Sequence, residues 1–429
     1  MSQNRTWTVP EGFLPVESQL EGVTVYAPTP PETEKPSAVS YKCPNCGATT
    51  RYDISAGGVA CEHCGYSQPT VAQKVGRAAE EFEFTLETIA AAELGWGIKR
   101  QEMHCDSCGA SLSIPEGALS ITCPFCASNR VNIRQAPAEI LRPRFLVPFK
   151  IQPDGLRATC NTWLKQGWFH PAELSAAAVL SHFTGIYIPF WTFDCRIQAD
   201  WKAEVGYERT ERYYNAGDKT WKTRTRIDWR WENGQINLPT DDQLIPGSTH
   251  LSWRILERIL DFKLNELVAY TPDFLVGWQA HAYDISLERA WDTAKEILRQ
   301  RAKDACYKDT PTSHVRNFSM VADYQDETWR FVLLPVYISA YRFQEKVYQV
   351  MVNGQTGTIA GQKPVAWWKI WLAIAGLLTP GLALSLIGLL TLVQGGLGVV
   401  VLIFGVLLLV GGGALSLMIY KQAIQSEAA

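Results

Sequence analysis

The chain has 429 residues, of which 47% are hydrophobic and 19% charged, and this length leaves room for about two to four domains. Its formal net charge of −3 excludes the overall positive charge that is typical of nucleic-acid-binding proteins. Residues 1–20 are polar and contain proline, so they do not have the apolar region of a secretory signal peptide.

Residues 1–40 are predicted to form a flexible leader. Proline recurs there among threonine, glutamate and serine, and the stretch cannot bury enough apolar surface to order itself. A first cysteine module follows at 41–68, and a connector at 69–102. Within the connector, residues 78–94 have apolar side chains at a spacing near 3.6, which predicts a helix.

The second cysteine module, at 103–133, repeats the internal pattern of the first. Each module contains two CxxC pairs separated by fourteen residues. This spacing lets four thiolates surround one Zn²⁺ ion, and such a site is structural because no coordination position stays open for water or substrate. We therefore expect two structural zinc ions, with the ligands Cys43, Cys46, Cys61, Cys64, Cys105, Cys108, Cys123 and Cys126.

Disulfide bonds are the alternative explanation for these eight cysteines. The remaining Cys160, Cys195 and Cys306 are far apart and unpatterned, which is typical of a protein in a reducing compartment. Two histidines, His63 and His104, lie beside ligand cysteines. Since each module already has four cysteines, we expect both histidines to be exposed and not to bind metal.

Residues 134–364 are predicted to form a mixed α/β cytoplasmic domain. Predicted strands lie at 145–149, 185–197 and 329–343, and a hairpin at 348–359 turns at Asn353-Gly354, a dipeptide that tolerates two positive φ angles. Predicted helices lie at 172–182, 251–269 and 286–307, the last with Ser286 as N-cap. Strands separated by helices and hairpins indicate an α+β fold.

Residues 221–231 alternate between two kinds of side chain. Tryptophan, threonine and isoleucine occupy one face of a predicted strand, and cations occupy the other. With two arginines before a predicted turn at 215–218, this gives a candidate anion- or partner-binding set of Arg209, Arg212, Lys222, Arg224, Arg226 and Arg230. The alternative is a solvated sheet face whose charges pair with Glu208, Glu211 and Asp218.

No catalytic motif is recognisable. The histidines of the central domain are scattered without metal-ligand spacing, and each is expected to be structural or exposed: His170, His182, His250, His281 and His314. The chain has no Gly-Lys dipeptide and thus no phosphate-binding loop of the kind that a helicase requires. We therefore expect no enzymatic activity.

The segment 365–420 is predicted to be a transmembrane hairpin, followed by a tail at 421–429. Two charge-free apolar runs, 370–393 and 397–419, each exceed the ~20 residues that cross a hydrocarbon core of ~30 Å. The flanking cations Lys363, Lys369 and Lys421 place both termini in the cytoplasm, and Trp367, Trp368 and Trp371 are predicted to lie at the headgroup level. An anionic inner leaflet would favour lipid headgroups over nucleic acid as the ligand of the cationic strand.

Several motifs in a fixed order resemble a family of bacterial double-zinc-ribbon membrane proteins. Besides the cysteine modules and the closing apolar pair, these are GIYIPFWTFDC at 185–195, LLPVYISAYRF at 333–343 and VNGQTGTIAGQKP at 352–364. Members are labelled TFIIB-type zinc-ribbon proteins or, from the ribbons alone, primosomal or helicase-like proteins. The resemblance covers about residues 41–420; it implies the eight zinc ligands and no catalytic residue. It also implies a phage-shock-type membrane-stress system with a peripheral or SPFH-type scaffold protein as partner.

The sequence thus predicts a two-pass protein of the bacterial inner membrane that recruits such a partner to the bilayer. Two other functions stay open: nucleic-acid binding by the ribbons, and an enzyme that acts at the membrane surface. The first is disfavoured because the modules contain few basic residues, namely Lys42, Arg51 and Arg130. The second has no motif to support it.

Overall fold

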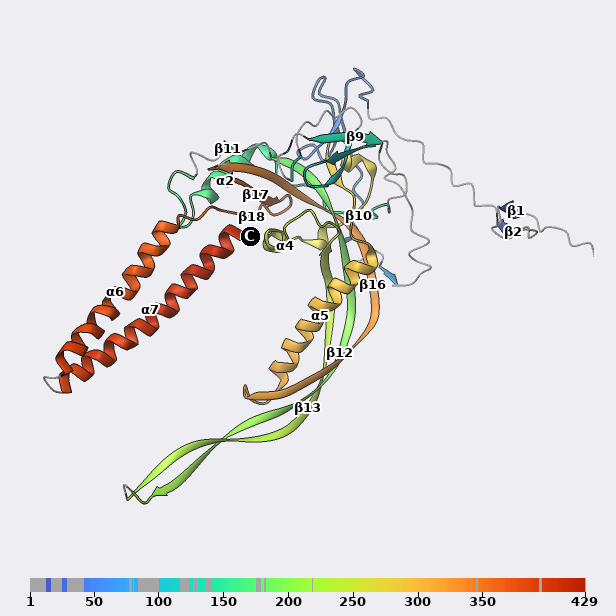
Figure 1. Cartoon of the computed structure of the whole chain (residues 1–429). Coiled ribbons are helices and arrows are strands. Elements are labelled where there is room, and N and C mark those ends of the chain that lie inside the picture. The colour runs from blue at the N-terminus through green and yellow to red at the C-terminus, as the bar shows by residue number, and fades with distance from the viewer. Residues whose placement is uncertain are drawn as a thin grey trace, which may run out of the picture.

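Three long antiparallel strands carry the central domain: β12 (Thr184–Asn215), β13 (Thr220–Pro246) and β16 (Val315–Phe343). β12 lies between the other two and pairs with both (Figure 1). The computed structural model describes residues 13–16, 25–28, 42–76, 79, 81–83, 100–115, 123–125, 128, 130–135, 141–174, 179–180, 183–217, 219–344, 346–392 and 396–428.

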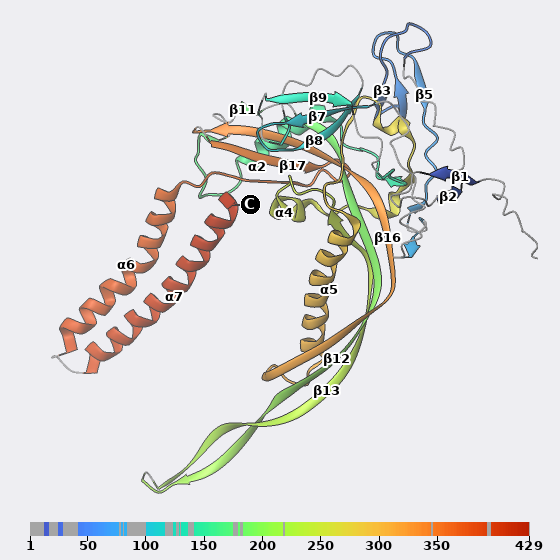
Figure 2. The same ribbon diagram turned by 45° about the vertical axis from the view of Figure 1, so that its right-hand side comes forward.

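Burial along β12 changes in three steps. Residues 186–193 are all buried, residues 195–205 alternate between buried and more exposed, and residues 208–214 are largely exposed. The pairing with β16 ends at Val205, so the last part of β12 pairs with β13 alone among the described strands. β12 thus begins inside the body of the protein. Its middle part belongs to a sheet that is covered on one face, and its last part forms a two-stranded ribbon with β13 (Figure 2).

Helix α5 (Leu287–Asp309) covers the concave face of the curved sheet (Figures 1 and 2). Its buried side chains recur at helical spacing and include three alanines, which let the helix approach the strands closely. Trp291 packs on Phe193 at 5.1 Å between ring centroids, and the Ser286 side chain caps the helix by accepting from the Arg289 N–H. The helix predicted over 286–307 is confirmed.

Shorter elements complete the body around the N-terminal half of β12 and the C-terminal half of β16. The strands are β6 (Phe82–Glu83), β10 (Phe145–Leu146), β11 (Val179–Leu180), β14 (Val268–Ala269), β15 (Gln279–His281), β17 (Lys346–Asn353) and β18 (Ile359–Gly361), and the helices are α2 (Leu156–Leu164) and α4 (Trp253–Leu256). All these strands belong to the same sheet as β12. The protein is therefore α+β in class, as predicted.

The two cysteine modules differ in how they join this body. The second supplies β7 (Arg100–Cys105), β8 (Ser111–Pro115) and β9 (Val131–Gln135), which extend the main sheet through β15. The first has a separate three-stranded sheet of β3 (Arg51–Asp53), β4 (Gly58–Ala60) and β5 (Ser67–Pro69). A two-stranded hairpin of β1 (Phe13–Val16) and β2 (Val25–Pro28) lies within the predicted leader.

Two predicted helices are wrong in the part of the chain that the structure describes. Within 172–182, Val179–Leu180 is a strand on β16. Within 251–269, α4 is followed by short 3-10 turns and then by β14, because the segment wraps around the 353–358 turn: Asp261 accepts from the Asn353 side-chain amide at 3.0 Å. Tertiary contacts outweigh the helical pattern there. The helix predicted over 78–94 lies almost wholly outside the described residues.

The predicted hairpin at 348–359 forms, but its turn differs from the prediction. The loop runs from Asn353 to Thr358, and its positive φ is at Gly357 (81°). The Asn353 side chain instead accepts from the N–H groups of Gln355 and Thr356, which builds an Asx turn. Gly354 is required for space, since a Cβ there would lie 2.5 Å from the Phe149 ring.

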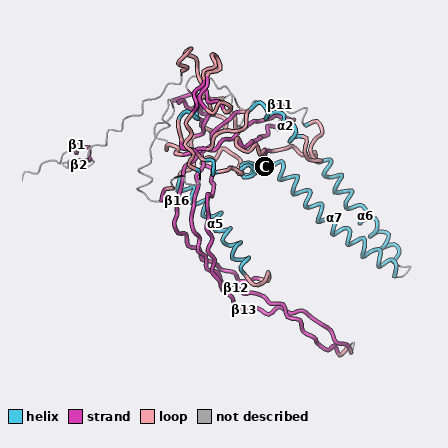
Figure 3. Tube along the Cα trace, turned by 180° about the vertical axis from the view of Figure 1, so that it is seen from behind, coloured by secondary structure: helices cyan, strands magenta, loops and turns pink. Residues whose placement is uncertain are grey.

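The C-terminal helices α6 (Trp367–Thr391) and α7 (Gly396–Ala428) form an apolar hairpin, and both are long and apolar enough to cross a membrane. Glycines bring the helices close together, because a Cβ at Gly388 or Gly405 would lie 2.5 Å from the facing backbone nitrogen. The hairpin and the β12–β13 ribbon leave the body on the same side in all three views (Figures 1–3).

Candidate metal centres and membrane junction

Four thiols meet in the first cysteine module. The Sγ atoms of Cys43 and Cys64 are 3.4 Å apart, those of Cys46 and Cys61 are 3.6 Å apart, and all four lie within 4.8 Å of one another. A disulfide would require about 2.05 Å, whereas two sulfurs bound to one Zn²⁺ ion with bonds of about 2.3 Å lie about 3.8 Å apart. The cluster therefore fits a shared metal ion.

The backbone builds three of the four cysteine knuckles in the same way, and the fourth lies partly outside the described residues. The N–H of Gly47 donates to the Cys43 carbonyl, and Gly65 and Gly109 make the same bond to Cys61 and Cys105. All three glycines have positive φ angles between 70° and 75°, which a side chain would strain. This turn lets the two thiols of a CxxC pair point to one centre, and it is why glycine follows the second cysteine.

In the first cluster, two neighbouring thiols have pKa values shifted in opposite directions. Burial raises the pKa of Cys43, but hydrogen bonds from the backbone N–H groups of Cys46 and Asn45 outweigh it and bring the pKa to about 7. For Cys64 the Tyr66 N–H lowers the pKa, yet the thiol contact with Cys43 and burial together raise it to about 12. A divalent cation would remove this conflict, because it stabilises neighbouring thiolates together.

The second module gathers three described cysteines, Cys105, Cys108 and Cys123, whose ligand atoms lie within 4.8 Å of one another. The Sγ atoms of Cys108 and Cys123 are 3.7 Å apart, and Cys105 and Cys123 are fully buried. Cys126 lies outside the described residues. This cluster, too, could hold a metal ion. Of the neighbouring histidines, His63 is exposed, and His104 contacts the Ser111 hydroxyl at 3.1 Å through Nδ1.

The apolar hairpin is fixed to the body, at what we call the membrane junction, by two lysines that the sequence suggested only as flanking charges. Lys363 is 7% exposed and donates from Nζ to the carbonyls of Trp163 (2.6 Å) and Gln166 (3.1 Å) at the end of α2. Lys369 donates to the His170 carbonyl at 2.7 Å. Burial lowers the pKa of Lys363 to about 8. The start of α6 is thus tied to the loop that follows α2.

Apolar contacts complete this membrane junction. Phe169 from the same loop packs in one cluster with Val365, Ile370 of α6 and Ala423 of α7. Next to Phe169, the Trp168 side chain is 54% exposed, like Trp368 and Trp371 at the start of α6. Tryptophan favours the headgroup level. Sequence reasoning missed Trp168, since only the tertiary structure brings it beside residues some two hundred positions later.

The candidate cations do gather on the β12–β13 ribbon, but not on one face. The pairing register places Arg209 opposite Arg226, so both share a face with Lys222, Arg224 and Arg230. Arg212 pairs with Thr223 and therefore lies on the other face, with Tyr214 and Trp221. The tip also exposes aromatic rings, with Trp221 68% and Tyr214 51% exposed.

Part of the cationic face is neutralised locally. Arg224 forms an ion pair with Glu211 at 3.1 Å, Arg209 lies 3.9 Å from Asp228, and Arg230 stacks over the Tyr207 ring. The ribbon therefore combines solvated ion pairs with exposed aromatic rings.

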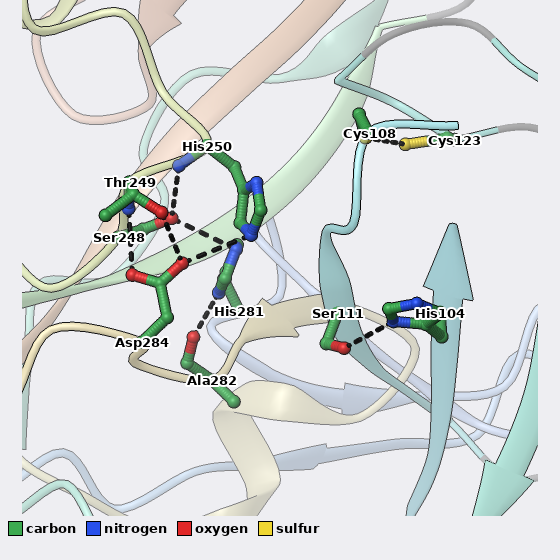
Figure 4. A network of polar contacts seen from close by, with 10 residues as sticks. All are labelled: His104, Cys108, Ser111, Cys123, Ser248, Thr249, His250, His281, Ala282 and Asp284. Carbon is green, nitrogen blue, oxygen red and sulfur yellow. Dashed lines mark hydrogen bonds and ion pairs between the residues drawn. The ribbon is translucent and has the colours of Figure 1, made fainter. Parts of the chain in front are cut away.

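A polar cluster beside the second cysteine module was not predicted (Figure 4). His250 follows β13, His281 ends β15, and Asp284 precedes α5. The Nε2 atom of His250 lies 3.2 Å from Asp284 Oδ2, and His281 Nε2 lies 3.1 Å from the Ser248 hydroxyl. The ring of Phe125, from the second module, contacts the His281 ring at 5.4 Å. The sequence did not signal this cluster, because His250 follows β13 whereas His281 and Asp284 lie at and just after the end of β15.

A second unpredicted network holds the base of the ribbon. Arg330 of β16 is 1% exposed and bonds through Nη2 to Asp242 (2.6 Å), Asp194 (2.8 Å) and Glu81 (3.2 Å). These carboxylates come from β13, β12 and the connector. Burial raises the pKa of Asp194 to about 6 although Arg330 acts against this rise. The network fixes the three long strands and the connector to one another.

In sequence, the chain is similar to the Uncharacterized protein YdjG of Bacillus subtilis (strain 168). The two are 24% identical over 345 residues, which are 77% of this chain and 92% of that protein. No protein-family model matches the chain, and no solved structure matches it.

Proposed function

We propose that this protein is a two-pass inner-membrane platform that presents two zinc-stabilised cysteine modules to the cytosol and recruits a peripheral membrane-stress or SPFH-type scaffold protein. The observation that carries the proposal is the membrane junction. Lys363 and Lys369 bind backbone carbonyls of the body, so the modules would be held at a fixed place relative to the bilayer. A flexible tether would not position them in this way.

Both modules are held on the same body. The second contributes its strands to the main sheet. The first docks through Tyr52, whose N–H donates to the Val276 carbonyl at 2.9 Å and whose ring contacts Phe274 at 5.0 Å between centroids. Lys363 and Lys369, which were expected to mark the cytoplasmic flank, lie where this body joins the apolar hairpin.

Zinc suits the donor set of the modules. Four cysteines around one centre are typical of structural zinc, and the sheet of the first module is too small to build a core of its own. In the two CxxC knuckles of the first module, the side chains of Asn45 and His63 are exposed and available to a partner. The metal would supply rigidity, and the knuckle side chains would supply the contacts.

Recruitment can be tested with the full-length protein in detergent. A photo-crosslinker at Asn45 or His63 is expected to capture one peripheral membrane protein reproducibly, and a crosslinker at exposed Arg301 of α5 is the matched control. Removal of residues 42–70 should abolish capture, because it deletes the separate first sheet and leaves the main sheet intact.

Anchoring is tested independently. A chain without residues 367–428 should still capture the partner, but the complex should move from the membrane to the soluble fraction. If neither knuckle position captures a specific protein, or if the α5 position captures the same protein equally well, recruitment by the modules is wrong.

A further inference from the structure

We propose that His250, His281 and Asp284 form a third metal site, which binds a divalent transition-metal ion through two imidazole nitrogens and one carboxylate oxygen. One ligand atom from each residue lies within 4.8 Å of those of the other two. Imidazole and carboxylate are ordinary ligands of Zn²⁺ and related ions. The site is distinct from the cysteine modules in its donors and lies beside the second of them (Figure 4).

The hydrogen bonding of His281 fixes which nitrogen faces the site. Its Nδ1 contacts the carbonyl of Ala282, and because a carbonyl can only accept, Nδ1 must carry the proton. The lone pair of Nε2 therefore points into the cluster, where the Ser248 hydroxyl lies 3.1 Å away. A backbone carbonyl on the remote nitrogen is the usual partner of a metal-binding histidine, because it orients the ring.

The ligand atoms of His250 and Asp284 have the spacing that is required to bind one shared metal ion. His250 Nε2 and Asp284 Oδ2 are 3.2 Å apart. Two ligands with metal bonds of about 2.0–2.1 Å in a tetrahedral arrangement lie about 3.3 Å from each other. The separation therefore allows one ion to bind both atoms with little movement of either side chain.

Backbone hydrogen bonds hold together the segments that carry the three residues. The N–H groups of Asp284 and Ile285 both donate to the Gly247 carbonyl, at 2.9 and 3.2 Å, which ties the loop after β13 to the loop before α5. His281 is fixed in the main sheet by its pairing with Leu112 of β8. The Asp284 carboxylate also accepts from the Thr249 N–H at 2.8 Å, an outer contact of the kind that orients metal ligands.

Solvent can reach the site from one side. The His281 side chain is 1% exposed, whereas the side chains of His250 and Asp284 are 23% and 30% exposed. A metal ion can therefore approach past the latter two residues. Three protein ligands leave a coordination position for water, unlike the closed four-cysteine sites.

A histidine–carboxylate pair alone does not make such a site, and the chain provides a matched control. His314 contacts Glu208 at 3.0 Å on the exposed ribbon, with the same pair of groups. It is not part of any set of three ligands among the described residues. A variant of His314 thus loses an equivalent ion pair without losing a metal ligand.

The test is metal analysis of the full-length protein in detergent after saturation with Zn²⁺ and removal of loosely bound ions. About three zinc ions per chain are expected, and H250Q or D284N should each reduce the content to about two, whereas H314Q should leave it unchanged. In the Co²⁺-loaded protein, H250Q and D284N should remove visible bands but preserve the thiolate-to-cobalt bands of the cysteine modules.

The comparison of the wild type with H250Q, D284N and H314Q decides whether the site exists, and the thiolate-to-cobalt bands show whether a variant still folds its cysteine modules. About two zinc ions in the saturated wild-type protein would overturn the proposal. Equal zinc contents in the wild type, H250Q and D284N would overturn it as well. Loss of all metal in D284N would be resolved by H250Q, because the Asp284 carboxylate also accepts from the Thr249 N–H and its replacement disturbs the loop as well as the ion pair.

Discussion

Replacement of Arg330 by methionine tests the network at the base of the ribbon. Methionine preserves the length of the buried side chain but removes the guanidinium that pairs with Asp194, Asp242 and Glu81. The carboxylates of Asp194 and Asp242 are 13% and 12% exposed, and both would lose this buried partner. Removing one partner of such a buried pair costs about 3–5 kcal/mol.

The expected effect can be stated as a change in the midpoint of thermal unfolding. For a domain of this size, 1 kcal/mol corresponds to about 2–4 °C, so R330M should lower the midpoint by roughly 6–20 °C. Tryptophan fluorescence of the detergent-solubilised protein is a suitable assay, because Trp329 adjoins Arg330 and packs on Trp191 at 5.9 Å.

The matched control is Arg196→Met. Arg196 pairs with Asp326 at 3.3 Å on the same sheet, but the two side chains are 54% and 68% exposed, and such pairs contribute only about 0–1 kcal/mol. Addition of D242N to R330M should recover part of the lost stability, because it removes one of the uncompensated charges. The reasoning is refuted if R330M and R196M unfold at the same temperature, or if D242N destabilises R330M further.

Four further outcomes are expected. The pKa of Asp194 is raised to about 6, against 3.8 for the free group, so the folded protein holds this proton more tightly than the unfolded chain. Its contribution to the free energy of unfolding is fully present below pH 3.8 and is lost as the pH rises through about 6. D194N should flatten this part of the pH–stability curve. The pKa of Lys363 is lowered to about 8, against 10.5 for the free group, so the membrane junction should become more stable as the pH rises from 8 to 10.5. Amide hydrogen exchange of residues 163–170 should be faster in K363M than in the wild type. The variant K421M, which replaces an exposed lysine, should leave this exchange unchanged. The double variant C43S/C46S should lose about one zinc ion and expose residues 42–76 to protease without affecting the main sheet. C105S should instead destabilise the main sheet, since β7 belongs to it. Equal protease patterns in the two variants would contradict this difference. In nanodiscs, the ribbon amides of residues 221–231 should exchange more slowly with anionic than with zwitterionic lipid, and R226E should abolish the difference; no lipid dependence in the wild type would leave the ribbon cations as a solvated face.

The cysteine sets could be recognised from sequence because a CxxC knuckle is local: its glycine, its turn and its two thiols lie within five residues. The apolar hairpin was equally accessible, since length and apolar composition decide whether a helix can span a bilayer. Helix α5 was found because its N-cap and its buried face both follow a short repeat.

Contacts between distant residues were not accessible in this way. The helical pattern of 251–269 failed because Asp261 and Lys263 bind the 353–358 turn, and nothing within 251–269 signals that turn. Arg212 was grouped with the other cations, but the hairpin register, set by the turn at 215–219, places it on the opposite face.

The sequence by itself determined the chemistry that depends on near neighbours: two cysteine clusters, an apolar hairpin and an α+β class. Only the tertiary structure decided that the second cysteine module belongs to the main sheet, that Lys363 is buried in the membrane junction, and that His250, His281 and Asp284 meet. The physical reason is that side-chain spacing along a chain fixes contacts over a few residues, whereas contacts between loops follow from strand pairing and packing of the whole domain.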